Sequence, residues 1–188
     1  MNVVLLNGSP RKEGNTKQAL LIIAAELNEE GIETEIINLG GHVFSGCRAC
    51  GGCGRNKDGK CVIDDGMNDI INSVFNADGL VIGSPTYFAN VTTEVKAFID
   101  RCGYVSKSCG GLLKGKSGAA AVVARRAGAD FVYAAINFFF GIAEMPIATS
   151  SYWNLALARD IGEMQKDEEG IRTFKTLGKN LASLIKSR

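Results

Sequence analysis

The sequence predicts an α/β protein with a doubly wound, five-stranded parallel sheet and helices on both faces. Short apolar runs, typical of strands buried on both faces, alternate along the chain with segments of helical apolar spacing. The first run ends in a glycine-containing loop that leads into a helix, as in strand–loop–helix units with right-handed crossovers. A length of 188 residues suits one single-core domain over residues 1–188.

Each predicted element follows from its local pattern. Five strands are predicted at Asn2–Leu6, Glu33–Leu39, Gly79–Gly83, Ser117–Val123 and Ile147–Ser151. Five helices are predicted at Thr16–Leu27, Met67–Phe75, Thr93–Arg101, Phe131–Phe140 and Ile161–Ile185. Asp64 and Asp65 stand just before the second helix, and we interpret them as its caps. Residues 40–65 show neither the helical nor the strand periodicity of apolar residues, and we interpret them as an inserted loop rich in glycine and cysteine.

Composition narrows the classes of partner. Hydrophobic residues make up 46% of the chain and charged residues 22%, as in an ordinary globular protein, and no segment is long and apolar enough to span a membrane. Lys and Arg number 21 against 20 Asp and Glu, so no field of one sign exists to attract nucleic acid or anionic lipid. The first apolar run lacks the features of a signal peptide, and we expect a soluble protein of the cytoplasm.

Loops that leave the carboxyl ends of the strands share one edge of such a sheet, and ligands bind there. These loops are 8–15, 40–65, 84–91 and 124–128. We therefore expect the four loops to bind their ligand together.

The first of these loops has the character of an anion site. Backbone N–H groups at the start of a helix, the hydroxyls of Ser9 and Thr16, and the charge of Arg11 would surround a phosphate. The loop matches neither the dinucleotide fingerprint nor the nucleotide P-loop. The alternative is a glycine turn in which Asn15 or Thr16 caps the helix.

Two motifs together resemble a known family. Residues 8–16 read G-S-x-R-x-x-x-N-T, and an S-P-x-Y stretch from residue 84 is followed by K-x-x-x-D-R at 96–101. The sequence is thereby similar to the NAD(P)H-dependent FMN reductase branch of the flavodoxin-like superfamily. The resemblance implies a flavodoxin-like fold, FMN as cofactor and NAD(P)H as a co-substrate. It places the FMN phosphate among Ser9, Arg11, Asn15 and Thr16.

In this family the loop after the third strand borders the flavin ring, and its residues suit that place physically. Pro85 stiffens the turn, Tyr87 and Phe88 offer flat apolar surface, and free backbone N–H groups can bond flavin oxygens and N5. The alternative is that Tyr87 or Phe88 packs against the next helix. The expected ring contacts are Pro85, Thr86, Tyr87, Phe88, Ala89, Asn90 and Val91.

Some single residues outside these motifs also bear on function. Arg125 and Arg126 follow the fourth strand, and we assign Arg125 to the flavin pyrimidine or a nicotinamide phosphate, with an exposed arginine pair as the alternative. His42 is the only histidine, which excludes hydrolase triads and His-rich metal sites. Trp153 and the run Phe138–Phe140 are expected in the core or at a dimer contact.

Four of the six cysteines form a compact group in the inserted loop. They are Cys47, Cys50, Cys53 and Cys61. In a reducing compartment such cysteines are thiols or metal ligands, and the C-x-x-C-x-x-C spacing lets three thiolates take three corners of one cubane. The other interpretations are a zinc site, a structural thiol loop, or reduced cysteines that bind nothing. Cys102 and Cys109 lack such spacing and are interpreted as small buried or loop residues.

The cysteine group is similar to that of the iron-sulfur flavoproteins of anaerobes, whose compact motif carries a 4Fe-4S cluster. The sequence departs from the motif of those proteins in two ways: the gap before the last cysteine is long, and no proline follows Cys61. A cluster here is expected on the FMN side of the sheet, beside its own flavin or facing that of a neighbouring subunit.

These observations predict an FMN-dependent oxidoreductase that transfers electrons between a 4Fe-4S cluster and FMN. The flavin N5 atom carries the chemistry, so no catalytic acid or base is assigned. The resemblance implies ferredoxin as electron donor and a homodimer or homotetramer. The first alternative is an NAD(P)H-dependent FMN or quinone reductase without a cluster. Others are a non-enzymatic carrier like flavodoxin and a zinc-stabilised binding module.

Overall fold

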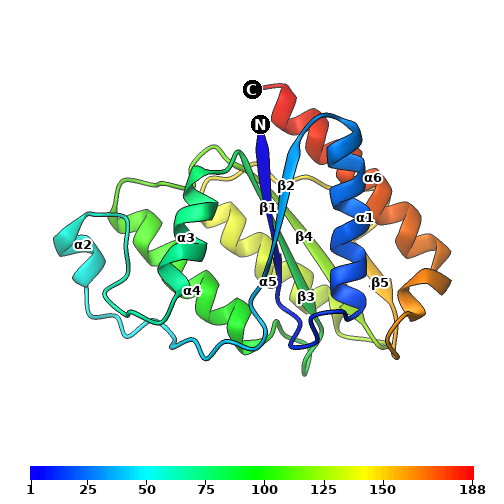
Figure 1. Ribbon diagram of the computed structural model, residues 1–188, viewed down its shortest axis with the longest axis horizontal. Helices are drawn as coiled ribbons and strands as arrows, with labels where there is room; N and C mark the ends of the chain where they lie inside the picture. The colour runs from blue at the N-terminus through cyan, green and yellow to red at the C-terminus, as the bar shows by residue number, and fades with distance from the viewer.

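The computed structural model describes all 188 residues and contains one sheet of five parallel strands (Figure 1). The strands are β1 (Asn2–Asn7), β2 (Glu33–Asn38), β3 (Gly79–Pro85), β4 (Ser117–Ala124) and β5 (Leu155–Leu157). Their order across the sheet is β2-β1-β3-β4-β5, which confirms the predicted doubly wound, flavodoxin-like topology. The strand order reverses at β1 and β3, so a ligand is expected where these two strands end.

Helices cover both faces of this sheet. They are α1 (Asn15–Glu29), α2 (Gly52–Asn56), α3 (Met67–Asn76), α4 (Thr93–Ser108), α5 (Ala129–Ile142) and α6 (Glu168–Lys186), with a 3-10 helix η1 (Glu163–Lys166). Helices α1 and α6 pack on one face, and α3, α4 and α5 on the other (Figure 1). A hydrophobic core lies on each face of the sheet, and the side chains of β1 alternate between them. Val3 and Leu5 belong to the core beneath α1 and α6, and Val4 and Leu6 to the core beneath α3, α4 and α5. No helix combines the length and apolar character needed to cross a membrane.

The predicted fifth strand is wrong. Ile147 makes only an isolated bridge to Gly118, and the strand that extends the sheet is β5, which pairs with the end of β4. The backbone N–H of Ala148 still donates to the carbonyl of Gly118 at 2.8 Å, so the predicted segment touches the sheet once and then leaves it. An apolar run shows that a segment is buried, but it does not show how long the segment stays in register with its neighbour.

The predicted closing helix is also wrong at its start. Residues from Ile161 onward first form η1, and α6 begins only after Asp167. The Asp167 carboxylate accepts a 3.0 Å hydrogen bond from the N–H of Gly170, so it caps the new helix. The same carboxylate accepts from the N–H of Leu157 at 2.7 Å, which ties the helix to β5.

The cap predicted for α3 is corrected as well. Gly66, at a φ of 85°, occupies the N-cap position, and the helix has no side-chain cap. Asp64 is exposed. Asp65 accepts one long bond of 3.3 Å from the N–H of Met67, but its carboxylate mainly binds Arg101, as described below.

Candidate cofactor site at the carboxyl edge

The loops after β1, β3 and β4 meet at the carboxyl edge of the sheet, the lower edge in Figure 1. The N–H of Gly8 donates to the carbonyl of Gly83 at 2.8 Å, and the Thr92 hydroxyl donates to the carbonyl of Gly8 at 2.8 Å. A Cβ atom at Gly8 would overlap with the Val95 side chain, so this close approach requires glycine. The first loop is thereby fixed against the start of α4.

The start of α1 leaves backbone donors free. Gly14 is the N-cap residue and no side chain caps the helix, so the alternative in which Asn15 or Thr16 acts as cap is not observed. The N–H groups of Glu13, Asn15 and Thr16 donate no hydrogen bond within the protein. Ser9 and Thr16 are buried beside them, and Arg11 is exposed with no ion pair. Free donors at the positive end of a helix, two hydroxyls and a guanidinium fit a phosphate group.

The Asn15 side chain has a different partner from the one expected. Its amide nitrogen donates to the carbonyl of Asp160 at 2.8 Å, and its oxygen accepts from the N–H groups of Gly162 at 3.0 Å and Met164 at 3.4 Å. The side chain therefore holds the segment before α6 against the first loop, and only its backbone N–H remains free for an anion. The partners are 145 or more positions away in the chain, so no local pattern could reveal this role.

The loop after β3 forms a tight two-residue hairpin. Tyr87 and Asn90 exchange backbone hydrogen bonds of 3.0 and 2.9 Å, and the residues between them, Phe88 and Ala89, have φ values of 49° and 57°. Left-handed backbone at a residue other than glycine costs about 1–2 kcal/mol, and such strain is concentrated at ligand sites. Tyr87 and Phe88 are exposed, so the alternative in which they pack against α4 is not observed.

An unpaired polar atom lies at the base of this hairpin. The N–H of Thr86 donates to the carbonyl of Val123 at 2.9 Å, but its buried hydroxyl has no hydrogen-bond partner. A buried polar atom without a partner costs about 1–3 kcal/mol, which a polar ligand atom would recover. A Cβ atom at Gly128 would lie 3.1 Å from that of Ala89, so the loop after β4 touches the hairpin.

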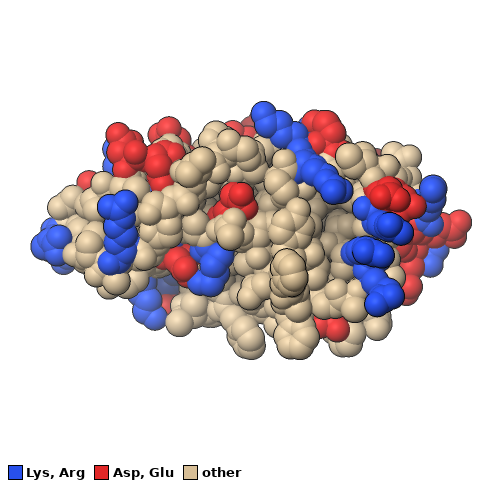
Figure 2. Space-filling view, turned by 90° about the horizontal axis from the view of Figure 1, so that it is seen from below, with Lys and Arg blue, Asp and Glu red and all other residues tan.

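Figure 2 looks directly at this edge of the sheet. Uncharged side chains form most of the middle of the face, and Lys and Arg side chains gather toward its right side. Arg125 and Arg126 are both exposed in the loop after β4. An uncharged centre with cationic groups beside it fits a flat aromatic ring that carries a phosphate.

The inserted loop begins at the same edge but leaves it. A Cβ atom at Gly40 would overlap with the carbonyl oxygen of Ser9, so the loop starts in contact with the proposed phosphate site. It then runs outward to α2, which lies beside α4 (Figure 1). Arg101 and Val105, which line the cysteine site, stand roughly 12 and 18 Å along α4 from Thr93, at 1.5 Å per residue. The expectation that all four loops meet at one ligand is therefore corrected for the cysteines.

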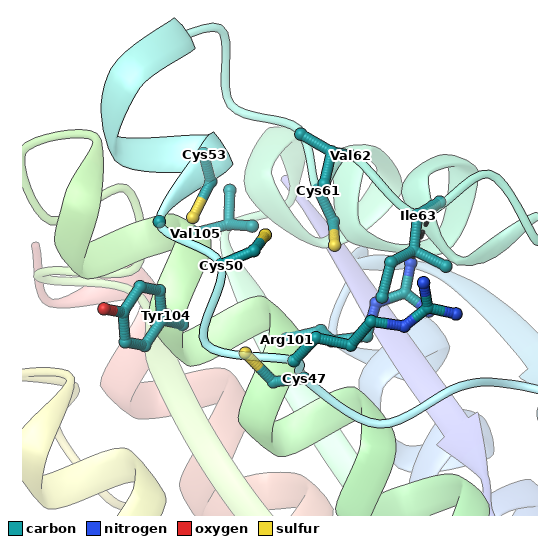
Figure 3. Close-up of a pocket in the computed structure, with 11 residues that line it drawn as sticks. Cys47, Cys50, Cys53, Cys61, Val62, Ile63, Arg101, Tyr104 and Val105 are labelled. Atoms are coloured by element: carbon teal, nitrogen blue, oxygen red, sulfur yellow. Dashed lines mark hydrogen bonds between the residues drawn. The ribbon is translucent and has the colours of Figure 1, made fainter.

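The four cysteines nevertheless lie around one hollow of about 20 Å³. Figure 3 shows their sulfur atoms turned toward a common space, with Val105 of α4 beside Cys53 and Cys50 and Tyr104 to the lower left. Cys53 is buried, Cys61 is half-buried, and the other two are exposed. Val62 packs so closely on α2 that a Cβ atom at Gly52 would overlap with it.

The donor set consists of four thiols, the type of ligand that holds iron-sulfur clusters. No three His, Cys, Asp or Glu side chains lie close enough together to hold one metal ion. A 4Fe-4S cubane instead places one thiolate on each of four irons, so its ligands stand farther apart around a hollow. The number and type of ligands around the hollow are those that such a cluster takes.

Arg101 joins the two ends of the cysteine loop. One guanidinium nitrogen, Nη1, donates to both Asp65 carboxylate oxygens at 2.8 and 2.6 Å and to the carbonyl of Ser45 at 3.2 Å. The other, Nη2, donates to the carbonyl of Ile63 at 3.0 Å. Burial works to raise the pKa of Asp65, but the hydrogen bonds from Arg101 and from the backbone N–H groups of Ser45 and Met67, together with the charge of Arg101, outweigh it and the pKa is lowered. The sequence shows Arg101 only as part of a motif and gives no sign of this pairing.

The two remaining cysteines lie outside the hollow. Cys102 is buried in the core, and burial raises the pKa of its thiol far above the ordinary value. Cys109 is half-buried, and its thiol lies 3.7 Å from the carbonyl oxygen of Cys53, which links the end of α4 to the cysteine loop. His42 is exposed and stacks on Phe44 with ring centroids 5.2 Å apart.

Known proteins resemble this chain in sequence and in fold. Residues 1–160 match the family described as NADPH-dependent FMN reductase. An iron-sulfur flavoprotein of Methanocaldococcus jannaschii is 34% identical over 196 residues, which cover 99% of this chain and 98% of the relative. One of Archaeoglobus fulgidus is 32% identical over 201 residues, with coverage of 100% and 96%. A solved flavodoxin from the domain Archaea shares the fold, with a TM-score of 0.66 at 17% identity and 99% of each chain covered. The chain therefore belongs to the NADPH-dependent FMN reductase family and, within it, to the iron-sulfur flavoproteins, which are FMN-binding oxidoreductases with the flavodoxin-like fold.

Proposed function

We propose that the protein holds FMN at the carboxyl edge and a 4Fe-4S cluster in the cysteine hollow, and that it transfers electrons between them. The observation that carries this proposal is the placement of Cys47, Cys50, Cys53 and Cys61 around one hollow beside a fold that binds FMN. FMN, when bound, supplies the chemistry by accepting and releasing electrons at its N5 atom.

Each loop at the edge has a task in holding FMN. The Ser9 and Thr16 hydroxyls, the Arg11 guanidinium and the backbone N–H of Asn15 would bind the phosphate. Arg125 would contact the flavin pyrimidine or a nicotinamide phosphate. The hairpin would lie along the ring through Pro85, Thr86, Tyr87, Phe88, Ala89, Asn90 and Val91.

Within the hairpin, the backbone N–H groups of Phe88 and Ala89 donate no hydrogen bond within the protein. They supply donors for flavin oxygens or N5, and the unpaired hydroxyl of Thr86 supplies another. The strained backbone is held in place by the protein before the ring arrives, so binding does not have to order it.

The position of the cysteines favours electron exchange with a second subunit. The hollow stands roughly 12 to 18 Å along α4 from the edge that would hold the chain's own flavin. Of the four cysteines around it, Cys47 and Cys50 are exposed. We propose a homodimer or homotetramer in which a cluster faces the flavin of a neighbour, with ferredoxin as donor and the cytoplasm as location.

A second candidate function is an NAD(P)H-dependent FMN or quinone reductase without a cluster. The match of residues 1–160 to the reductase family favours it. The exposed Arg125 and Arg126 beside the edge supply charge for a nicotinamide phosphate. In this case hydride passes from NADH or NADPH to FMN, and the cysteines remain thiols.

One set of measurements separates the two functions. Protein purified without oxygen is assayed for FMN, iron, zinc and acid-labile sulfide, and its visible spectrum is recorded. Replacing any one of Cys47, Cys50, Cys53 or Cys61 by Ala should bleach the iron-sulfur absorbance or convert the centre, while FMN stays bound. Cys102→Ala, outside the hollow, is the matched control and should retain iron. Stoichiometric FMN with neither iron nor sulfide in the wild type would show that the reductase function is correct.

A further inference from the structure

One of the residues that line the cysteine hollow is a buried arginine, to which the electron-transfer proposal assigns no role. Arg101 is 1% exposed and lines the hollow together with the four cysteines. A buried guanidinium is unfavourable unless its charge and its N–H groups find partners. Asp65, whose side chain is 16% exposed, supplies the opposite charge at 2.6 Å from Nη1.

The hydrogen bonding of Arg101 is incomplete. Its two terminal nitrogens bind Asp65 and the carbonyls of Ser45 and Ile63, but its Nε–H is buried and has no acceptor. Cys61 and Arg101 line the same hollow (Figure 3).

We infer that Arg101 is a positioning residue that sets the reduction potential of the cluster held by Cys61 and its three partners. The inference rests on the proposed function. The positive charge of Arg101 and its unpaired Nε–H, both buried at the hollow, favour the reduced, more negative state of the cluster. Asp65 opposes this charge in part, so the pair together determines the field at the hollow.

A purely structural role would have a different signature. Arg101 also joins the two ends of the loop, so any replacement loosens the cysteines. Loosening reduces the amount of cluster that is retained, in Arg101→Lys and Arg101→Met alike. A change of field instead shifts the potential of the cluster that is retained, and only where the charge is lost.

The test is an anaerobic redox titration of the FMN-containing protein, with the cluster followed by its electron paramagnetic resonance signal. Arg101→Met should lower the reduced-to-oxidised ratio of the cluster at a fixed potential about tenfold. For a one-electron centre this corresponds to a midpoint potential that is lower by about 59 mV. Arg101→Lys keeps the charge and should stay near the wild type. Asp65→Asn should move the potential upward. Lys107→Met removes the same charge from an exposed position of α4 and should leave the potential unchanged.

The outcomes separate the two proposals. Wild-type protein without iron and sulfide would overturn the electron-transfer function and this inference with it. A wild type that holds the cluster, together with an Arg101→Met variant of the same midpoint, would overturn this inference alone. If Arg101→Met retains no cluster, the Asp65→Asn variant tests the inference instead. An unchanged cluster midpoint in Asp65→Asn would also overturn it. The FMN midpoint serves as an internal reference in each titration.

Discussion

The Thr92 hydroxyl donates a 2.8 Å hydrogen bond to the carbonyl oxygen of Gly8, across 84 positions of the chain. The same hydroxyl accepts from the N–H of Val95 at 3.4 Å, so it also caps α4. One side chain thus aligns the start of α4 with the loop that opens α1. The two helices that flank the switch point of the sheet are held in fixed positions before any ligand binds.

The phosphate loop gives the first prediction. Arg11→Ala combined with Thr16→Ala should weaken FMN binding by about 1.5–3 kcal/mol for each charged hydrogen bond that is lost. Titration of the FMN-free protein, followed by flavin fluorescence, measures this. Lys12→Ala, an exposed cation in the same loop, is the control. Unchanged affinity in the double variant would contradict the assignment.

Asn15 gives a second, different prediction. Asn15→Ala removes three hydrogen bonds to residues 160–164 and leaves their backbone groups unpaired, so the free energy of unfolding should fall by about 2 kcal/mol. Urea unfolding measures it. Asn180→Ala removes one exposed bond to Thr149 and should cost less than about 1 kcal/mol. A stable Asn15→Ala variant with poor FMN binding would instead indicate a direct phosphate contact.

The hairpin after β3 gives a third prediction. Tyr87→Ala should change the visible spectrum and reduction potential of bound FMN without unfolding the protein, because the side chain is 47% exposed. Leu21→Ala, at 49% exposed on α1, is the control and should change neither property. A structure with FMN bound and the hairpin elsewhere would rule the contact out.

The Arg101–Asp65 pair gives a prediction for pH. The pKa of Asp65 is lower in the folded protein than in the unfolded chain. The pair therefore stabilises the fold fully at a pH above the unfolded pKa of about 3.9, and this stabilisation is lost as the pH falls through the folded pKa. Asp65→Asn should therefore be less stable than the wild type at neutral pH. The difference between their free energies of unfolding should narrow below about pH 4. A difference that stays constant with pH would mean that the charge of Asp65 does not stabilise the fold.

The sequence predicted the features that depend on local pattern. Strands β1, β3 and β4 are continuous apolar runs buried on both faces, and the glycine loop after β1 marks the start of α1. Strand β5 was misplaced, because only its pairing with Val122, Val123 and Ala124 distinguishes it from the apolar segment before it.

The unpredicted parts of the site depend on distant partners. Asp65 reads locally as a helix cap, yet it binds a cation 36 positions away, and that cation holds the cysteine loop beside α4. Asn15 reads locally as a phosphate ligand, yet its side chain binds residues before α6. Charge and amide groups give no local signal of the partner that the fold will bring to them. The motifs identified the loops, and the tertiary structure determined which atoms remain free.

The bonds at Arg101 also make the cysteine loop a separable module. The N–H of Ser45 donates to the Asp65 carboxylate at 3.0 Å, so the two ends of residues 45–65 lie side by side. A short turn joining those ends would leave the sheet, the first loop and the hairpin as they are, since the entropy of loop closure changes only slowly with loop length. The same scaffold can therefore exist with or without the thiols, and the architecture allows a one-cofactor reductase and a two-cofactor electron-transfer protein to descend from each other by a single insertion or deletion.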